Sequence, residues 1–238
     1  FNDFGEIIDN QLLAGVNSNH GKDYSVFQPL WLSNGQLVVS EDSSGWWNLM
    51  VLNLDDQISI NGKLPWKSLW PMQAEFGMPQ WVYGMSTNAA YGNKIISAVC
   101  KKGLWRLYIL SLNGNKTLFS QPFEDLSYLH AANGHAVLIA SNAYKESGIL
   151  ELNLEESSWE YSSIKESEFF PDEISVAKSF WFKGYQDKLT HSWYYPPSNQ
   201  KYALPPLLVK SHSGPTSMTS NSLNRVIQFW TSRGWAVV

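Results

Sequence analysis

The sequence contains very little cysteine and few charged residues. Cys100 is the only Cys among 238 residues, and Asp, Glu, Lys and Arg together make up 16% of the chain. A single Cys forms no disulfide within the chain, and its place in the apolar run 95–100 predicts a buried thiol, which favours a cytoplasmic protein. The low charge argues against a disordered chain and against a coiled coil, because both need many charged residues.

Long apolar runs and basic clusters are also missing. No stretch reaches the ~18 apolar residues that a membrane-spanning helix needs, and the N-terminus lacks the basic and then apolar pattern of a signal peptide. The net charge is −4 and no run of basic residues occurs, so the sequence has no electrostatic footprint for nucleic acid or for an anionic membrane. We therefore expect neither partner.

Motifs for cofactors and metals are absent as well. The sequence has no Gly-Lys-Ser/Thr phrase of a phosphate loop and no Gly-x-Gly-x-x-Gly phrase of a dinucleotide site. His130 and His135 are near each other in sequence, but no third ligand stands close to them, which does not suit zinc. We predict no cofactor and no metal.

Tryptophan is abundant by contrast, with 12 residues in the chain, and the chain is repetitive. The segments 27–52, 78–110 and 126–154 can be laid over one another, because each contains short apolar runs separated by turns rich in Asn, Ser, Lys and Gly. A phrase of Gly, aromatic residues and Leu recurs as Gly45-Trp46-Trp47-Asn48-Leu49 and Gly103-Leu104-Trp105-Arg106-Leu107. Units of roughly 45 to 50 residues built in this way are typical of β-propeller blades.

We predict about three blades over residues 1–168, which is part of a ring because propellers need about four to eight blades. An ordinary antiparallel sandwich is the alternative. The alternation of Leu150, Leu152 and Leu154 with polar residues predicts that this run is the outermost strand of the third blade, with one face exposed. Five Trp residues recur at blade positions and are predicted to pack between neighbouring blades: Trp31, Trp46, Trp47, Trp81 and Trp105.

The last third of the chain has a different pattern. Two strands are predicted at 174–183 and 188–195, and a short buried strand at 207–210. A helix follows, capped by Ser220, Asn221 or Ser222, with four apolar residues spaced to share one face: Leu223, Val226, Ile227 and Trp230. The apolar run 235–238 is the next strand. A strand, turn, helix and strand in this order predict a parallel crossover, so residues 169–238 are predicted to begin an α/β domain.

Two segments carry a resemblance to a known family. Residues 205–216, Pro-Pro-Leu-Leu-Val-Lys-Ser-His-Ser-Gly-Pro-Thr, and residues 230–238, Trp-Thr-Ser-Arg-Gly-Trp-Ala-Val-Val, resemble the start of the catalytic domain in the prolyl oligopeptidase family, in its acylaminoacyl-peptidase and dipeptidyl-aminopeptidase-like branch. The resemblance implies a serine peptidase in which a propeller caps an α/β-hydrolase domain and admits short peptides. Ser213 departs from the family pattern, because it replaces the first Gly of a His-Gly-Gly-Pro phrase.

The resemblance also implies where the catalytic residues stand. The family nucleophile lies in a Gly-x-Ser-x-Gly phrase with Asp and His later in the chain, and this sequence has no such phrase, since residues 84–88 fail at their last position. We therefore predict that the triad lies beyond Val238, that this chain has no catalytic residue, and that it is inactive alone. The chain begins with Phe1 and ends in an apolar run, so we expect a piece of a longer protein.

Two further site predictions follow. His212, Ser213, Gly214 and Pro215 are predicted to form a loop beside the oxyanion site; the alternative is a plain turn between a strand and a helix. Glu75 is a candidate contact for the α-ammonium group of a substrate, although a surface or capping carboxylate is the reading we favour. We expect a short peptide as partner and leave a homo-oligomer open. The rival function is a non-catalytic propeller that binds peptide or glycan through aromatic side chains.

Overall fold

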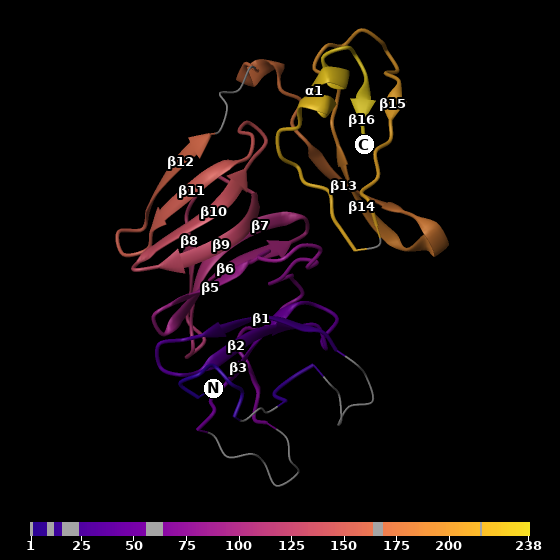
Figure 1. The fold of residues 1–238 in the computed structure, drawn as a ribbon. Coiled ribbons are helices and arrows are strands. Elements are labelled where there is room, and N and C mark those ends of the chain that lie inside the picture. Colours follow the sequence, from indigo (N-terminus) through magenta and orange to yellow (C-terminus); the bar gives the residue numbers. More distant parts are fainter. Residues whose placement is uncertain (1, 9–11, 16–23, 56–63, 164–168, 215) are drawn as a thin grey trace.

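The computed structural model describes residues 2–8, 12–15, 24–55, 64–163, 169–214 and 216–238 (Figure 1). Within these ranges three four-stranded antiparallel sheets are followed by two two-stranded sheets and one α-helix. Figure 1 shows the three large sheets stacked in chain order, in the manner of propeller blades. The predicted partial propeller is confirmed.

Each blade is built from four consecutive strands. The first blade contains β1 (Val26–Trp31), β2 (Leu37–Glu41), β3 (Asn48–Leu52) and β4 (Lys67–Ser68). The second contains β5 (Asn88–Tyr91), β6 (Lys94–Lys101), β7 (Leu104–Ser111) and β8 (Lys116–Phe119). The third contains β9 (Asp125–Ala132), β10 (His135–Ser141), β11 (Gly148–Asn153) and β12 (Ser158–Ser163).

The repeated phrase occupies the same place in the first two blades. Gly45 and Gly103 lie in the turns between the second and third strands, with φ of +84° and +81°, which glycine adopts at little cost. Leu49 pairs with Ser40, and Leu107 pairs with Ala98. Both Leu side chains are fully buried. The repeat in the sequence is therefore a repeat in the structure.

The core lies between neighbouring blades, and the middle blade contributes to both halves of it. Ile95 and Val99 of β6 face the cluster shared with the first blade, whereas Ile96, Ala98 and Cys100 face the cluster shared with the third. Because both faces of β6 are covered, its residues 95–100 are apolar except for Ser97 and do not alternate with polar residues. Cys100 is buried as predicted, and burial raises the pKa of its thiol to about 12.

The third blade corrects one prediction. The run Leu150 to Leu154 is not outermost, because β11 pairs with β10 on one side and with β12 on the other. Strand β12 has the sequence Ser-Trp-Glu-Tyr-Ser-Ser and is mostly exposed. Its largely polar sequence did not predict a strand. The three Leu side chains are buried because one face of β11 covers the cluster between blades.

The predicted packing of the five Trp residues is only partly right. Trp105 is buried in the cluster between the second and third blades, as predicted. The ring of Trp47 packs edge-on against Phe27 of its own blade, at 4.3 Å between centroids, so this contact does not join two blades. Trp31, Trp46 and Trp81 are exposed, so the prediction is wrong for them. They lie at a strand end, in a turn and in a connection between blades, where no neighbouring sheet covers them.

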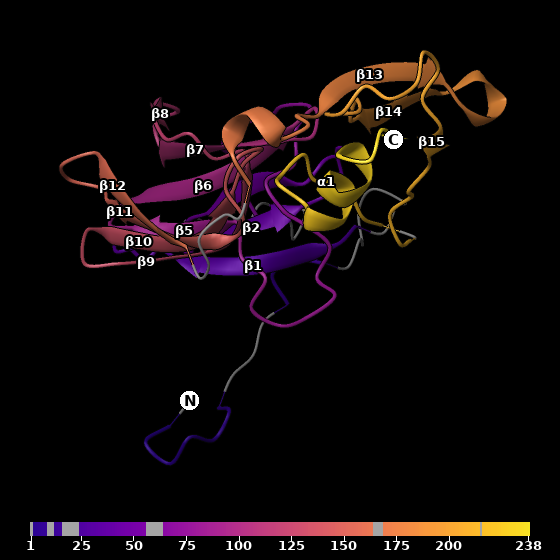
Figure 2. The same cartoon turned by 90° about the horizontal axis from the view of Figure 1, so that it is seen from above.

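The C-terminal part has the predicted element order. A short 3₁₀ turn, Pro171–Glu173, leads to the hairpin of β13 (Lys178–Lys183) and β14 (Leu189–Tyr194), with a second 3₁₀ turn, Tyr185–Asp187, between its strands. Then follow β15 (Leu207–Leu208), α1 (Arg225–Thr231) and β16 (Ala236–Val237). Strands β15 and β16 pair in parallel, and Tyr195 forms an antiparallel bridge with Val237. Figures 1 and 2 show these elements at one side of the stacked blades.

The helix begins later than predicted. Asn224 caps it, since its side chain accepts hydrogen bonds from the backbone N–H groups of Val226 and Ile227. Val226 is exposed, so it does not share a buried face with Ile227. The prediction is wrong because residues 216–223 form irregular structure that hydrogen-bonds to the blades through Thr216 and Leu223 before the helix starts. The boundary between 168 and 169 stays a prediction, and residues 164–168 lie outside the described ranges.

Candidate functional site

The segment 216–225, which we call the strap, joins the predicted active-site loop to helix α1. It is hydrogen-bonded to the blades along its length. The indole N–H of Trp81 donates to the carbonyl of Thr216 at 3.0 Å, and the N–H of Leu223 donates to the carbonyl of Asn142 at 2.8 Å. At its end, Arg225 forms a two-pronged ion pair with Glu146, with an Nε–Oε1 distance of 2.5 Å.

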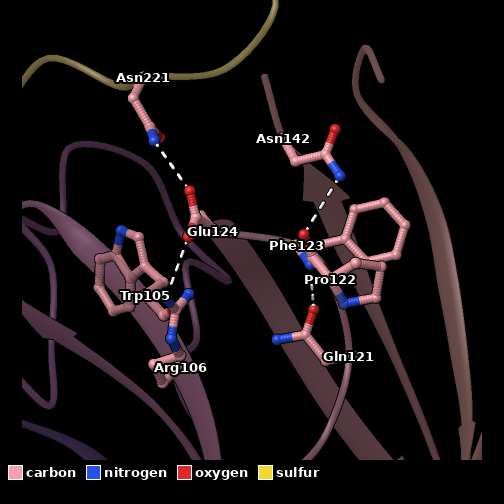
Figure 3. Close-up of polar contacts among 8 residues, drawn as sticks. All are labelled: Trp105, Arg106, Gln121, Pro122, Phe123, Glu124, Asn142 and Asn221. Atoms are coloured by element: carbon pink, nitrogen blue, oxygen red, sulfur yellow. Dashed lines mark hydrogen bonds and ion pairs between the residues drawn. The ribbon is translucent and has the colours of Figure 1, made fainter. Parts of the chain in front are cut away.

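Glu124 is the central anchor of the strap, and sequence reasoning missed it. Its carboxylate lies between two partners (Figure 3): Oε1 is 3.0 Å from Arg106 Nη2, and Oε2 accepts a hydrogen bond of 3.1 Å from Asn221 Nδ2. Arg106 and Glu124 also line a shallow pocket between β8 and β9, together with Gln121 and Pro122. The charge of Glu124 is therefore compensated inside the protein.

Glu75 occupies the corresponding junction between the first and second blades. Its backbone exchanges two hydrogen bonds of 2.9 Å with Cys100, and its Oε2 accepts a hydrogen bond of 2.9 Å from the N–H of Trp47. Burial raises the pKa of the Glu75 carboxyl above its usual value, and the negative charge of Asp42 raises it further. No ion pair involves Glu75 within the part of the chain that the structure describes.

The two junctions share a signal that the sequence contains. Glu75 stands directly before Phe76, and Glu124 stands directly after Phe123. Both Phe side chains are fully buried. A glutamate next to a buried aromatic residue is therefore the sequence pattern that the two blade junctions have in common. The third repeat is the weakest of the three in the sequence, so the pattern at Glu124 is harder to recognise than that at Glu75.

The predicted active-site loop is exposed. His212, Ser213 and Gly214 lie at the surface, and Pro215 lies outside the described residues. Ser213 is not among the residues with positive φ, so a serine replaces the family glycine here without backbone strain. Nδ1 of His212 donates to the carbonyl of Ser213 at 2.9 Å.

Glu75 and the predicted active-site loop are not in direct hydrogen-bond contact. No hydrogen bond joins Glu75 to residues 212–214 in the described ranges. The link between them is indirect: Cys100, the backbone partner of Glu75, has its Sγ 3.9 Å from the Sδ of Met218 in the strap. Within the described part of the chain, Glu75 is thus connected to the strap only through Cys100 and Met218.

Other candidates from the sequence have structural roles. The Ser86 hydroxyl, in the imperfect 84–88 phrase, donates to the carbonyl of Leu129 at 2.7 Å. His130 lies beside Ser86, with 3.3 Å between Nε2 and Oγ. The described residues contain no group of three His, Cys, Asp or Glu side chains that could hold a metal ion. No helix in these ranges is long and apolar enough to cross a membrane.

Comparison with known proteins identifies the fold. No protein-family model matches the chain, and no curated protein sequence matches it. Among solved structures, a puromycin hydrolase is similar with a TM-score of 0.80 and 24% identity, covering 91% of this chain and 33% of that one. A puromycin-hydrolyzing peptidase of Mycobacterium tuberculosis is similar with a TM-score of 0.79 and 25% identity, over 91% of this chain and 34% of that one. The chain has the fold of the prolyl oligopeptidase family.

More distant members of this fold agree with the assignment. Prolyl oligopeptidase B from Galerina marginata is similar with a TM-score of 0.69 and 11% identity, covering 90% of this chain and 29% of that one. The resemblance to the prolyl oligopeptidase family seen in the sequence is confirmed, and the similar proteins are peptidases. The chain spans about a third of the length of the solved structures that it matches.

Proposed function

We propose that this chain is the propeller-side half of the active-site cleft of a serine peptidase that hydrolyses short peptides. Residues 212–215 border the cleft in this proposal, and the Ser, His and Asp of the triad follow after Val238. The supporting observation is the hydrogen bond from Trp81 to Thr216, which connects a blade directly to the residue after the loop. A loop tied to the blades in this way borders any ligand held between the two parts.

The loop acts through its backbone and shape. In acyl transfer a negative charge develops on the carbonyl oxygen, and backbone N–H groups directed at that oxygen stabilise it. The exposed loop 212–214 is free to offer such groups. His212 is not the general base in this proposal, because the base of the resembled family comes last in the chain order.

Glu75 binds the α-ammonium group of the peptide in this proposal. Burial and the nearby charge of Asp42 raise the pKa of its carboxyl, and no ion pair of the described residues brings a cation to it. A bound ammonium group supplies that cation and favours the ionised carboxylate. Glu124 does not suit this role, because Arg106 already compensates its charge.

A serine-directed probe tests the proposal on the full-length protein that contains this chain. A fluorophosphonate modifies an activated serine, and mass spectrometry locates it. We expect modification within a Gly-x-Ser-x-Gly phrase C-terminal to Val238, together with hydrolysis of a short fluorogenic peptide. A protein that binds the peptide but is neither modified nor active contradicts the proposal and supports the non-catalytic propeller.

A further inference from the structure

A row of exposed apolar side chains lies in the connection between the first and second blades. Trp81 is 61% exposed, Val82 is 55% exposed and Tyr83 is fully exposed. We call residues 80–85 the aromatic loop. Single exposed apolar residues are common on proteins, but three large ones in succession mark a contact surface. No packing inside the blades uses these side chains.

The base of the aromatic loop is fixed. Gln80 Nε2 donates to the carbonyls of Met78 and Met85 at 3.0 and 2.8 Å. Gln28 Nε2 donates to the same carbonyl of Met85 at 2.9 Å. Gln28 itself has a φ of +52° in strand β1, and its Oε1 accepts a hydrogen bond from the N–H of Thr87 at 3.2 Å. The amide side chains of Gln28 and Gln80 thus hold the two ends of the aromatic loop in place, while its tip is exposed to solvent.

The aromatic loop is connected to the segment beside the proposed active site through Trp81. Trp81 bonds to Thr216, which directly follows the loop 212–215. Glu75 lies earlier in the same connection between blades. A peptide whose ammonium group lies at Glu75 and whose scissile bond lies at the loop 212–215 passes the aromatic loop. In our proposal the apolar surface and the carboxylate are therefore parts of one binding surface.

We propose that Trp81, Val82 and Tyr83 form a wall of the cleft that contacts an apolar or aromatic side chain of the peptide, next to the scissile bond. This inference rests on the proposed peptidase function and adds the class of substrate that it prefers. An aromatic ring on the substrate loses its contact with water against this wall, which favours peptides with Phe over peptides with Ala. Trp81 also positions the loop through Thr216, whereas Tyr83 has only the contact role.

The test compares two matched fluorogenic peptides, with Phe or with Ala beside the scissile bond, on the full-length protein. Tyr83→Ala is expected to lower the ratio of kcat/KM for Phe over Ala at least about tenfold, because pocket contacts of this size discriminate by about 10- to 200-fold. Tyr83→Phe keeps the ring and is expected to keep the ratio. Tyr144→Ala is the matched control, since Tyr144 is also exposed but lies in the turn between β10 and β11.

Two outcomes overturn the proposal. An unchanged Phe/Ala ratio in Tyr83→Ala shows that the ring does not touch the substrate. A lower melting temperature of Tyr83→Ala with an unchanged ratio assigns the loop to a contact within the protein instead. If the wild-type protein cleaves neither peptide, the peptidase proposal fails separately. Affinities of both peptides for wild type and Tyr83→Ala, measured by calorimetry, then still decide whether the wall exists.

Discussion

The two blade junctions are built alike but differ in how their charge is compensated. Each has a fully buried Phe, Phe76 or Phe123, and a glutamate beside it. Glu124 is held by Arg106 and by Asn221 of the strap. Glu75 accepts one backbone hydrogen bond and lies near Asp42. The same architecture therefore differs in its charge compensation: one junction fastens the C-terminal part, and the other has the carboxylate that binds the substrate ammonium group in our proposal.

The largest expected effect tests what the junctions share. Phe76→Ala and Phe123→Ala are each expected to lower the free energy of unfolding by about 3–5 kcal/mol, because each removes a fully buried ring. Chemical denaturation of the full-length protein measures the loss. Leu118→Ala is the control, since Leu118 is exposed and is expected to change stability by less than about 0.5 kcal/mol. Equal effects at all three positions refute the assigned core.

The next effect tests the carboxylate of Glu75, which has no ion-pair partner among the described residues. Glu75→Gln is expected to lower kcat/KM for peptides with a free N-terminus about 10- to 100-fold, because it removes the charge that pairs with the ammonium group. Acetylated peptides should be affected much less. Initial rates with matched free and acetylated peptides give both values. Glu160→Gln, on the exposed strand β12, serves as the control; a loss of the same size for acetylated peptides would remove Glu75 from the ammonium site.

Glu124→Gln is expected to act on the strap instead. It keeps an acceptor for Asn221 but loses the ion pair with Arg106, which is partly exposed, so the cost is about 1 kcal/mol. Hydrogen exchange should become faster in residues 216–225, whereas β6 and β7 should keep their protection. Uniform loss of protection throughout the blades would contradict an anchoring role. The ratio of rates for free and acetylated peptides is expected to stay constant.

The smallest expected effect is a change in melting temperature with pH. Its direction in Glu75→Gln distinguishes Glu75 from Glu124. The pKa of Glu75 is raised in the folded state, so its contribution to stability is present below the unfolded pKa and is lost as pH rises through the folded pKa. At pH 7 the ionised Glu75 carboxylate therefore lowers the stability of the fold. Glu75→Gln removes this charge, so the melting temperature at pH 7 is expected to rise slightly relative to wild type. The difference should vanish near pH 4. A melting temperature that falls at pH 7 would show that the Glu75 charge stabilises the fold.

Much of the fold could be predicted because its signals are local. Glycine turns, apolar runs and the recurring Gly-aromatic-Leu phrase predicted the blades, and the strand, helix and strand order predicted the parallel pair of β15 and β16. Strand β12 and the start of helix α1 were mispredicted. A polar strand at the edge of a blade has no apolar pattern, and the helix begins at Asn224 because the strap before it follows the blades.

The candidate site was only half predictable. Residues 212–215 and Glu75 stood out by sequence resemblance and by a charge in an apolar stretch. Glu124 and the aromatic loop did not, because their roles depend on partners far along the chain: Asn221 for the former and Thr216 for the latter.

The sequence alone determined the repeated blades, the buried Cys100 and the resemblance to the prolyl oligopeptidase family, because each depends on residues close together in the chain. Tertiary structure decided which Trp side chains are buried and which glutamate is compensated. Burial and charge pairing depend on what the neighbouring blade and the strap bring to each residue, and a linear pattern contains neither. Trp105 and Trp46 stand in similar phrases, yet only Trp105 is buried in the cluster between two blades.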